Sequence, residues 1–139
     1  AASLPYRPIS EKIAELIVDT VERHLLTSRG LRTLSPADPA YHGKYRGNQA
    51  QRDHAYHNGT VWLWLLGSYA DAKMAIWGES ARPFLQKLLY GLEEALYTYG
   101  WGSLAEIYEG DAPHDPCGAP AQAWSVAEIL RIAFHLKLL

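Results

Sequence analysis

Four amphipathic stretches, separated by connections of very unequal length, are the feature that most constrains this chain. Apolar residues recur at three- and four-residue steps over residues 10–27, 60–77, 80–99 and 120–137, which predicts four helices. A tight turn at residues 78–80 joins the middle two, whereas about 30 and about 20 residues form the outer connections. If consecutive helices run antiparallel, both long connections lie at one end. The sequence therefore predicts an all-α fold of four main antiparallel helices with two long loops at one end.

The expected helix ends follow from capping chemistry. Ser10 is expected to cap the first helix, and Gly30, Gly78 and Gly100 to end the first three. Pro120 suits the first position of the fourth helix. No segment alternates cleanly between apolar and polar residues, and β-branched residues are few, so no strand is expected.

Composition restricts the class of protein. A length of 139 residues suits one domain, and 48% apolar with 20% charged residues argues against disorder. The formal net charge of −2 provides no basic field for a nucleic acid or an anionic membrane. No apolar run reaches the roughly 18 residues of a membrane span, and no signal peptide opens the chain. The single Cys117 favours a reducing compartment, so a cytoplasmic location is expected. Because the chain opens without Met, residues 1–139 are interpreted as a single domain or a fragment.

Aromatic and acidic residues are compatible with a sugar site. The chain has five Trp and nine Tyr but only two Phe, which suits polar ligands with flat apolar faces, and equally suits residues at the edge of a core. Glycoside hydrolysis uses two carboxyl groups, roughly 5–5.5 Å apart for retention and roughly 6.5–9.5 Å for inversion. Carboxylates in loops also serve as solvated surface groups or helix caps. The candidates on the long connections are Asp53, Glu106, Glu109, Asp111 and Asp115.

Other chemistries receive less support from the sequence. The long connections carry His42, His54, His57 and His114, but their spacing matches no metal-ligand pattern, so neither a metal nor a cofactor is expected. No glycine-rich loop follows a strand, which argues against nucleotide binding. Cys117 has no evident base beside it and is interpreted as a small loop residue.

Two blocks of sequence carry a family resemblance. The first comprises GLRTLSP at 30–36, YHGKYRG at 41–47 and RDHAYHNGTVW at 52–62. The second comprises AEIYEGD at 105–111, Pro113-His114 and AQAWSVAE at 121–128. In this order and spacing the blocks resemble the amylo-α-1,6-glucosidase domain, the C-terminal part of glycogen debranching enzymes.

That resemblance implies a fold, a reaction and a set of roles. The family's catalytic domain is an (α/α)6 barrel, of which this chain resembles the closing portion. The reaction is inverting hydrolysis of an α-1,6-linked glucosyl stub on an α-glucan such as glycogen or limit dextrin. Glu106 is the candidate general base, with Glu109 and Asp111 as orienting neighbours. The expected substrate-binding residues are Asp53, Tyr56, His57, Trp62, Trp101, Tyr108, His114, Gln122 and Trp124.

One departure from the family pattern limits the expected activity. The general acid of the family is an Asp upstream of the matching region, and no residue here corresponds to it. Whether the chain is an enzyme alone therefore stays open. The alternatives are a non-catalytic glucan-binding or assembly module, and another (α/α)6 glycosidase of trehalase or glucoamylase type. Apolar surface on the first and fourth helices predicts self-association or packing on the rest of a barrel.

Overall fold

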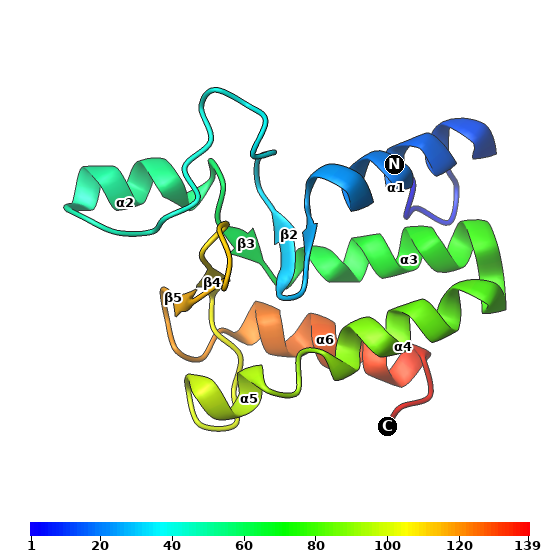
Figure 1. The fold of residues 1–139 in the computed structure, drawn as a ribbon. Coiled ribbons are helices and arrows are strands. Elements are labelled where there is room, and N and C mark those ends of the chain that lie inside the picture. Colours follow the sequence, from blue (N-terminus) through cyan, green and yellow to red (C-terminus); the bar gives the residue numbers. More distant parts are fainter.

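A computed structural model describes all 139 residues, which form a group of helices with a small sheet at one end (Figure 1). The elements in chain order are α1 (Glu11–His24), β1 (Leu26–Thr27), β2 (Gly30–Arg32), α2 (Gln49–Tyr56), β3 (Val61–Trp62), α3 (Leu65–Trp77), the 3-10 helix η1 (Gly78–Ala81), α4 (Arg82–Tyr90), α5 (Ala95–Thr98), β4 (Ile107–Tyr108), β5 (Pro116–Cys117) and α6 (Ala123–His135).

The sheet shows that the expectation of an all-α fold is wrong. Five antiparallel strands lie in the order β1-β2-β3-β4-β5. Two of them, β1 and β3, fall at the ends of expected helices, and the other three fall in the long connections. Each strand is only two or three residues long, so alternation of apolar and polar residues has no length in which to appear. The elements also do not form a double ring of helices, so the barrel architecture implied by the resemblance is not supported (Figure 1).

Strand pairing joins segments that are distant in sequence. Leu31 of β2 lies opposite Trp62 of β3, and Val61 lies opposite Tyr108 of β4. Gly30 permits the first of these pairings, because its φ of +136° is unfavourable for other residues and an added Cβ would lie 2.7 Å from the carbonyl oxygen of Trp62. The two long connections therefore meet at the sheet.

The helices agree with the sequence pattern in part. The backbone N–H of Ile13 donates to the Ser10 side chain at 3.4 Å, so the expected cap of α1 is present, and Gly78 follows α3 as expected. The helix expected over residues 80–99 is instead divided into η1, α4 and α5, with turns at residues 91–94. The helix expected from Pro120 begins at Ala123.

One helix was not expected at all. Asn48 and Gln51 form a reciprocal capping box that starts α2 within the first long connection. Seven of the eight residues of α2 show at least part of their side chains to solvent, and only Ala55 is buried. A helix with so little apolar surface gives no periodic pattern, which explains why the sequence did not reveal it.

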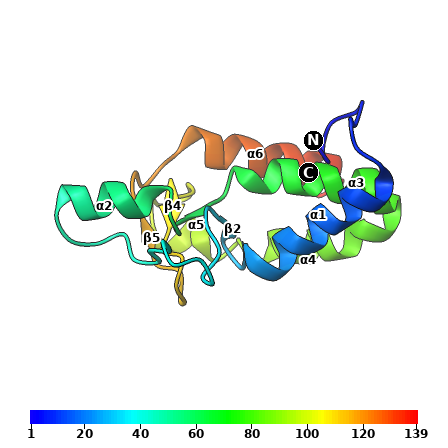
Figure 2. The same cartoon turned by 90° about the horizontal axis from the view of Figure 1, so that it is seen from above.

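The core is organised around α3, which lies between α1 and α6 (Figure 2). Its buried members come from both the helices and the sheet, and the largest fully buried side chains include Leu63, Leu66, Leu85, Tyr108 and Leu136. The short connection through η1 lies at the end opposite the sheet (Figure 1). No helix has both the length and the apolar character needed to cross a membrane.

Candidate functional site

The Glu106 carboxylate is held between the two long connections. Its Oε1 accepts a hydrogen bond from the Tyr56 hydroxyl, and its Oε2 accepts one from the backbone N–H of Ala119 at 2.9 Å. Gly118 packs so closely that an added Cβ would lie 2.5 Å from Oε2. Glu106 takes part in none of the ion pairs of the chain. The carboxylate is therefore partly buried, oriented by neutral donors, and not neutralised by a cation.

Aromatic rings surround the residue that donates to Glu106. Trp62 Nε1 donates to the Tyr56 carbonyl at 3.1 Å, and the two rings meet edge to face with centroids 4.8 Å apart. The His57 ring stacks on Trp62 at 5.6 Å with an interplanar angle of 8°. Burial and the hydrogen bond to Glu106 both raise the pKa of Tyr56 well above that of an ordinary phenol. Tyr56 is therefore a neutral donor at physiological pH.

A second glutamate lies in a different environment only three residues away. Glu109 is 2% exposed, and its carboxylate accepts hydrogen bonds from Lys44 at 2.8 Å and from Arg46 Nε at 2.6 Å. Burial alone would raise the pKa of Glu109, but the hydrogen bonds from Arg46 and Lys44 outweigh it and the pKa lies below its usual value. Arg46 also pairs with Asp115 at 3.1 Å. This cluster fixes the first long connection onto the second.

Two further expected site residues also connect loop segments. Asp111 Oδ1 accepts a hydrogen bond from the Tyr41 hydroxyl at 3.0 Å, and His114 Nδ1 lies 2.8 Å from the Glu109 carbonyl oxygen. The backbone N–H of Gly110 donates to the Gly43 carbonyl at 2.8 Å, which continues the same contact. None of these hydrogen bonds involves the Glu106 carboxylate.

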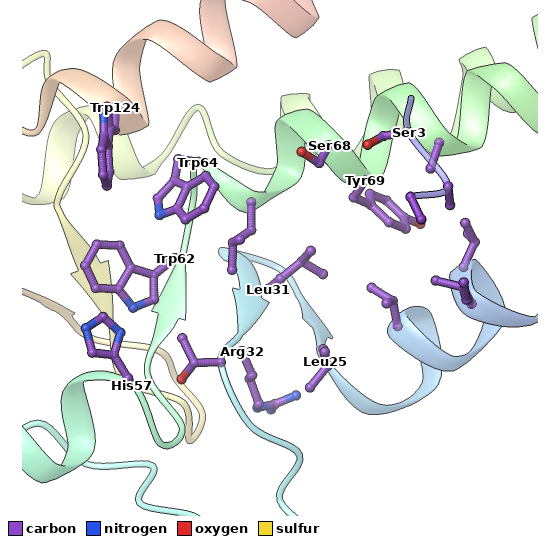
Figure 3. A pocket seen from close by; sticks show the side chains of 18 residues that line it. Ser3, Leu25, Leu31, Arg32, His57, Trp62, Trp64, Ser68, Tyr69 and Trp124 are labelled. Atoms are coloured by element: carbon purple, nitrogen blue, oxygen red, sulfur yellow. The ribbon is translucent and has the colours of Figure 1, made fainter. Parts of the chain in front are cut away.

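A groove of about 570 Å³ runs from the sheet along α1 and α3 (Figure 3). At the sheet end it is lined by His57, Trp62, Trp64 and Trp124, and the Trp64 and Trp124 rings lie 5.5 Å apart. Farther along α1 and α3 the lining is mostly aliphatic. Glu106 does not line the groove, but Trp62 contacts both the groove and the Tyr56 ring that donates to Glu106.

The structure brings together some of the expected substrate-binding residues and separates others. Tyr56, His57 and Trp62 lie next to Glu106 or next to each other. The other expected residues lie elsewhere. Trp124 is in the groove with its side chain largely exposed, Asp53 is exposed on α2, and Trp101 is 98% exposed in a bend. Tyr108 is 1% exposed within the core, His114 contacts the Glu109 carbonyl, and Gln122 occupies the N-cap position of α6 without a side-chain capping hydrogen bond.

Several residues of the site escape sequence reasoning. The backbone donor of Ala119 has no signature in its side chain, and Trp64 lies within residues 60–77, whose pattern predicts a helix and does not indicate a groove. Lys44 and Arg46 lie within the YHGKYRG block, whose two cations could have indicated a buried anionic partner.

Metal and thiol chemistry find little support in the side-chain arrangement. No group of three or more His, Cys, Asp or Glu side chains is placed to hold a metal ion. Burial, together with the nearby carboxylates of Glu109 and Asp115, raises the pKa of the Cys117 thiol to about 12. The thiol is therefore protonated and a poor nucleophile at neutral pH.

Comparison with known proteins adds independent findings. A family model described as amylo-alpha-1,6-glucosidase matches residues 1–131. A curated relative, the glycogen debranching enzyme of Saccharomyces cerevisiae, is 27% identical over 128 residues. That alignment covers 77% of this chain but only 8% of the yeast protein. The chain thus spans a small part of the length of this relative.

Proposed function

The chain belongs to the amylo-alpha-1,6-glucosidase family, and we propose that it supplies the general base of a glycogen-debranching glucosidase. The substrate in this proposal is the α-1,6-linked glucosyl stub of an α-glucan. The observation that carries the proposal is the Glu106 carboxylate, held by the Ala119 N–H and by Tyr56, whose ring lies against Trp62. A carboxylate that is oriented but not paired with a cation is suited to accept a proton.

In the proposed reaction, Glu106 removes a proton from a water molecule as its oxygen attacks the anomeric carbon. The glycosidic bond breaks as the new bond forms on the opposite face, and the leaving oxygen takes a proton from a second carboxyl group. We place that acid outside residues 1–139, because none of them matches the family's acid. Inversion requires roughly 6.5–9.5 Å between the two carboxyl groups, which leaves room for the water.

Sugar binding in this proposal uses the aromatic surface next to Glu106. In this proposal the exposed His57 ring, which stacks on the 5%-exposed Trp62, supports a pyranose face, and Trp124 extends this surface along the groove. Aromatic residues with polar edges suit such ligands because they combine an apolar face with hydrogen-bonding atoms. Asp53 and Gln122 remain predicted ligands for sugar hydroxyls.

Two assays test this proposal. In the glucosidase that contains this chain, Glu106→Gln is expected to lower kcat by about 10²–10⁴-fold on a limit dextrin, since general-base catalysis contributes that much. Asp115→Asn, which alters an exposed carboxylate nearby, is the matched control and should leave the rate near that of the parent. Near-normal turnover of Glu106→Gln would reject Glu106 as the base.

The isolated chain provides the second assay. Residues 1–139 alone are expected to show almost no α-1,6-glucosidase activity, because the acid is absent. Full activity of the isolated chain would overturn the missing-acid argument. Preferential hydrolysis of trehalose or of α-1,4-linked ends by the assembled enzyme would favour a trehalase- or glucoamylase-like enzyme instead.

A second candidate function is a non-catalytic glucan-binding or assembly module. The observation in its favour is the exposed apolar surface of α1 and α6, where Leu16, Leu130 and Phe134 are each more than half exposed. This candidate predicts that the isolated chain binds a maltooligosaccharide or a second chain, and that Glu106→Gln leaves that binding unchanged. Calorimetric titration of both proteins with maltoheptaose distinguishes the two functions.

A further inference from the structure

The family resemblance implies that Tyr56 binds sugar, but the contacts of Tyr56 indicate a different role. Its hydroxyl is engaged with Glu106 Oε1, and the other oxygen of the carboxylate is held by the Ala119 N–H at 2.9 Å. These donors come from the two long connections: Tyr56 ends α2 in the first, and Ala119 follows β5 in the second. The carboxylate therefore joins the two connections and its orientation depends on both.

Tyr56 is itself firmly held. Its backbone carbonyl accepts hydrogen bonds from Thr60 Oγ1 at 2.7 Å and from Trp62 Nε1 at 3.1 Å. Its ring lies 4.8 Å from the His57 ring and 4.8 Å from the Trp62 ring, centroid to centroid. A ring fixed on two sides and at its backbone has little freedom to turn toward a ligand, so its hydroxyl presents one fixed direction to Glu106.

The chemical character of the donor is also informative. An Arg or Lys in this place would orient the carboxylate but would also pair with its charge. A phenol orients the carboxylate and leaves its charge in place. An ionised carboxylate offers about four lone-pair sites, of which Tyr56 and Ala119 occupy two, so sites remain for a water molecule. A general base needs a carboxylate that is oriented, keeps its charge and has a lone pair free for a water molecule, and these contacts of Glu106 allow all three.

We infer that Tyr56 is the positioning residue of the site: its hydroxyl fixes the direction of the Glu106 carboxylate toward the attacking water. This inference rests on the proposed role of Glu106 as general base. It assigns to Tyr56 no direct contact with sugar, so removal of its hydroxyl changes the chemical step and leaves substrate affinity nearly unchanged.

The first test needs no catalytic activity. The isolated chain is labelled with ¹³C at tyrosine Cζ, and hydroxyl exchange with solvent is measured by NMR at neutral pH. The Tyr56 resonance is assigned by its loss in Tyr56→Phe. We expect its hydroxyl to exchange at least about tenfold more slowly than that of Tyr6, whose side chain is 95% exposed. Glu106→Ala should abolish this protection. Exchange as fast as that of Tyr6 in the parent chain would overturn the inference.

The second test separates positioning from sugar binding. In the glucosidase that contains this chain, Tyr56→Phe is expected to lower kcat about tenfold or more with KM within about twofold, because an interaction made in the transition state is lost. The matched control is Tyr45→Phe, which removes a hydroxyl from the ring 5.9 Å away and should leave both constants unchanged. A raised KM with normal kcat in Tyr56→Phe would instead make Tyr56 a sugar ligand and overturn the inference.

Failure of the inference and failure of the proposed function have different signatures. If Glu106→Gln is as active as the parent, the general-base assignment is wrong and Tyr56 has no base to position, even where its hydroxyl is protected. If Glu106→Gln is inactive while Tyr56→Phe keeps a normal kcat, Glu106 stands as the base and only the positioning role is rejected.

Discussion

Glu106 and Glu109 are three residues apart in sequence, yet their surroundings suit opposite uses. Glu106 is oriented by a phenol and a backbone N–H, whereas Glu109 is buried against Lys44 and Arg46. A carboxylate paired with two cations is a poor proton acceptor, because its pKa is held below the usual range. Residue type and spacing alone do not distinguish Glu106 from Glu109. Their hydrogen-bond and ion-pair partners identify Glu106 as the candidate base and Glu109 as a structural anchor.

Glu109 provides a prediction about stability. Glu109→Gln leaves the two cations without their anionic partner and is expected to lower the free energy of unfolding by about 1–3 kcal/mol at pH 7. Urea unfolding measures this difference. Asp115→Asn, which removes an exposed partner of Arg46, should cost less than about 1 kcal/mol. Equal stability of Glu109→Gln and the parent would contradict the anchoring role.

The same residue predicts a dependence on pH. Because the pKa of Glu109 is lower in the folded than in the unfolded state, its contribution is fully present above the usual value of 4.5 and is lost as pH falls through the lowered folded value. The stability difference between the parent and Glu109→Gln should therefore be constant above about pH 5 and shrink below it. Unfolding curves at several pH values between 3 and 7 check this sign.

At the level of elements, the short strands decide how the functional segments meet. The pairing of β2 with β3 and of β3 with β4 brings residues 30–32 and 107–108 to either side of Val61 and Trp62. Turn and cap residues such as Ser10 and Gly78 were predicted correctly, because their effect is local. Two-residue strands are invisible in the sequence, because their pairing energy comes from partners that are many residues away.

Gly30 provides a prediction for the sheet. Gly30→Ala combines an unfavourable φ of +136° with a Cβ only 2.7 Å from the Trp62 carbonyl oxygen. We expect it to lower the free energy of unfolding by about 3 kcal/mol or more, since strain at such a position alone costs about 1–3 kcal/mol. Thermal or urea unfolding measures the loss.

The control for this prediction is Gly78→Ala. Gly78 also has positive φ, at +56°, but an added Cβ would meet no atom within 4 Å. Gly78→Ala therefore measures the cost of the backbone conformation without a close contact. We expect it to lower the free energy of unfolding by about 1–3 kcal/mol. If the two substitutions cost the same, the contact between β2 and β3 does not require a glycine.

On the scale of the whole molecule, the two helices that flank α3 each carry exposed apolar residues. On α1 they are Ile13, Leu16 and Ile17, and on α6 they are Trp124, Leu130 and Phe134, all between 40% and 69% exposed. The sequence predicted this surface from the expectation that the first and fourth helices pack on neighbours. The exposure is now observed, whereas what covers it remains a prediction.

This surface predicts self-association of the isolated chain. Sedimentation velocity should show a mean mass that rises with concentration, because exposed apolar stripes of this kind favour association. Leu16→Glu and Phe134→Glu should each shift the chain toward the monomer. Tyr97→Glu, which places the same charge on an exposed residue of α5, is the control. A strictly monomeric parent chain at all concentrations would contradict the prediction.

The sequence by itself determined the position of three of the long helices, the meeting of both long connections at one end, and the family to which the chain belongs. These follow from local periodicity and from long runs of specific residues, which need no knowledge of partners. Only the tertiary structure decided that a sheet joins the connections, that Tyr108 is buried in the core, and that Tyr56 contacts Glu106. The physical reason is that pairing, burial and hydrogen bonding between residues about 50 positions apart depend on the whole packed chain, and no local pattern records them.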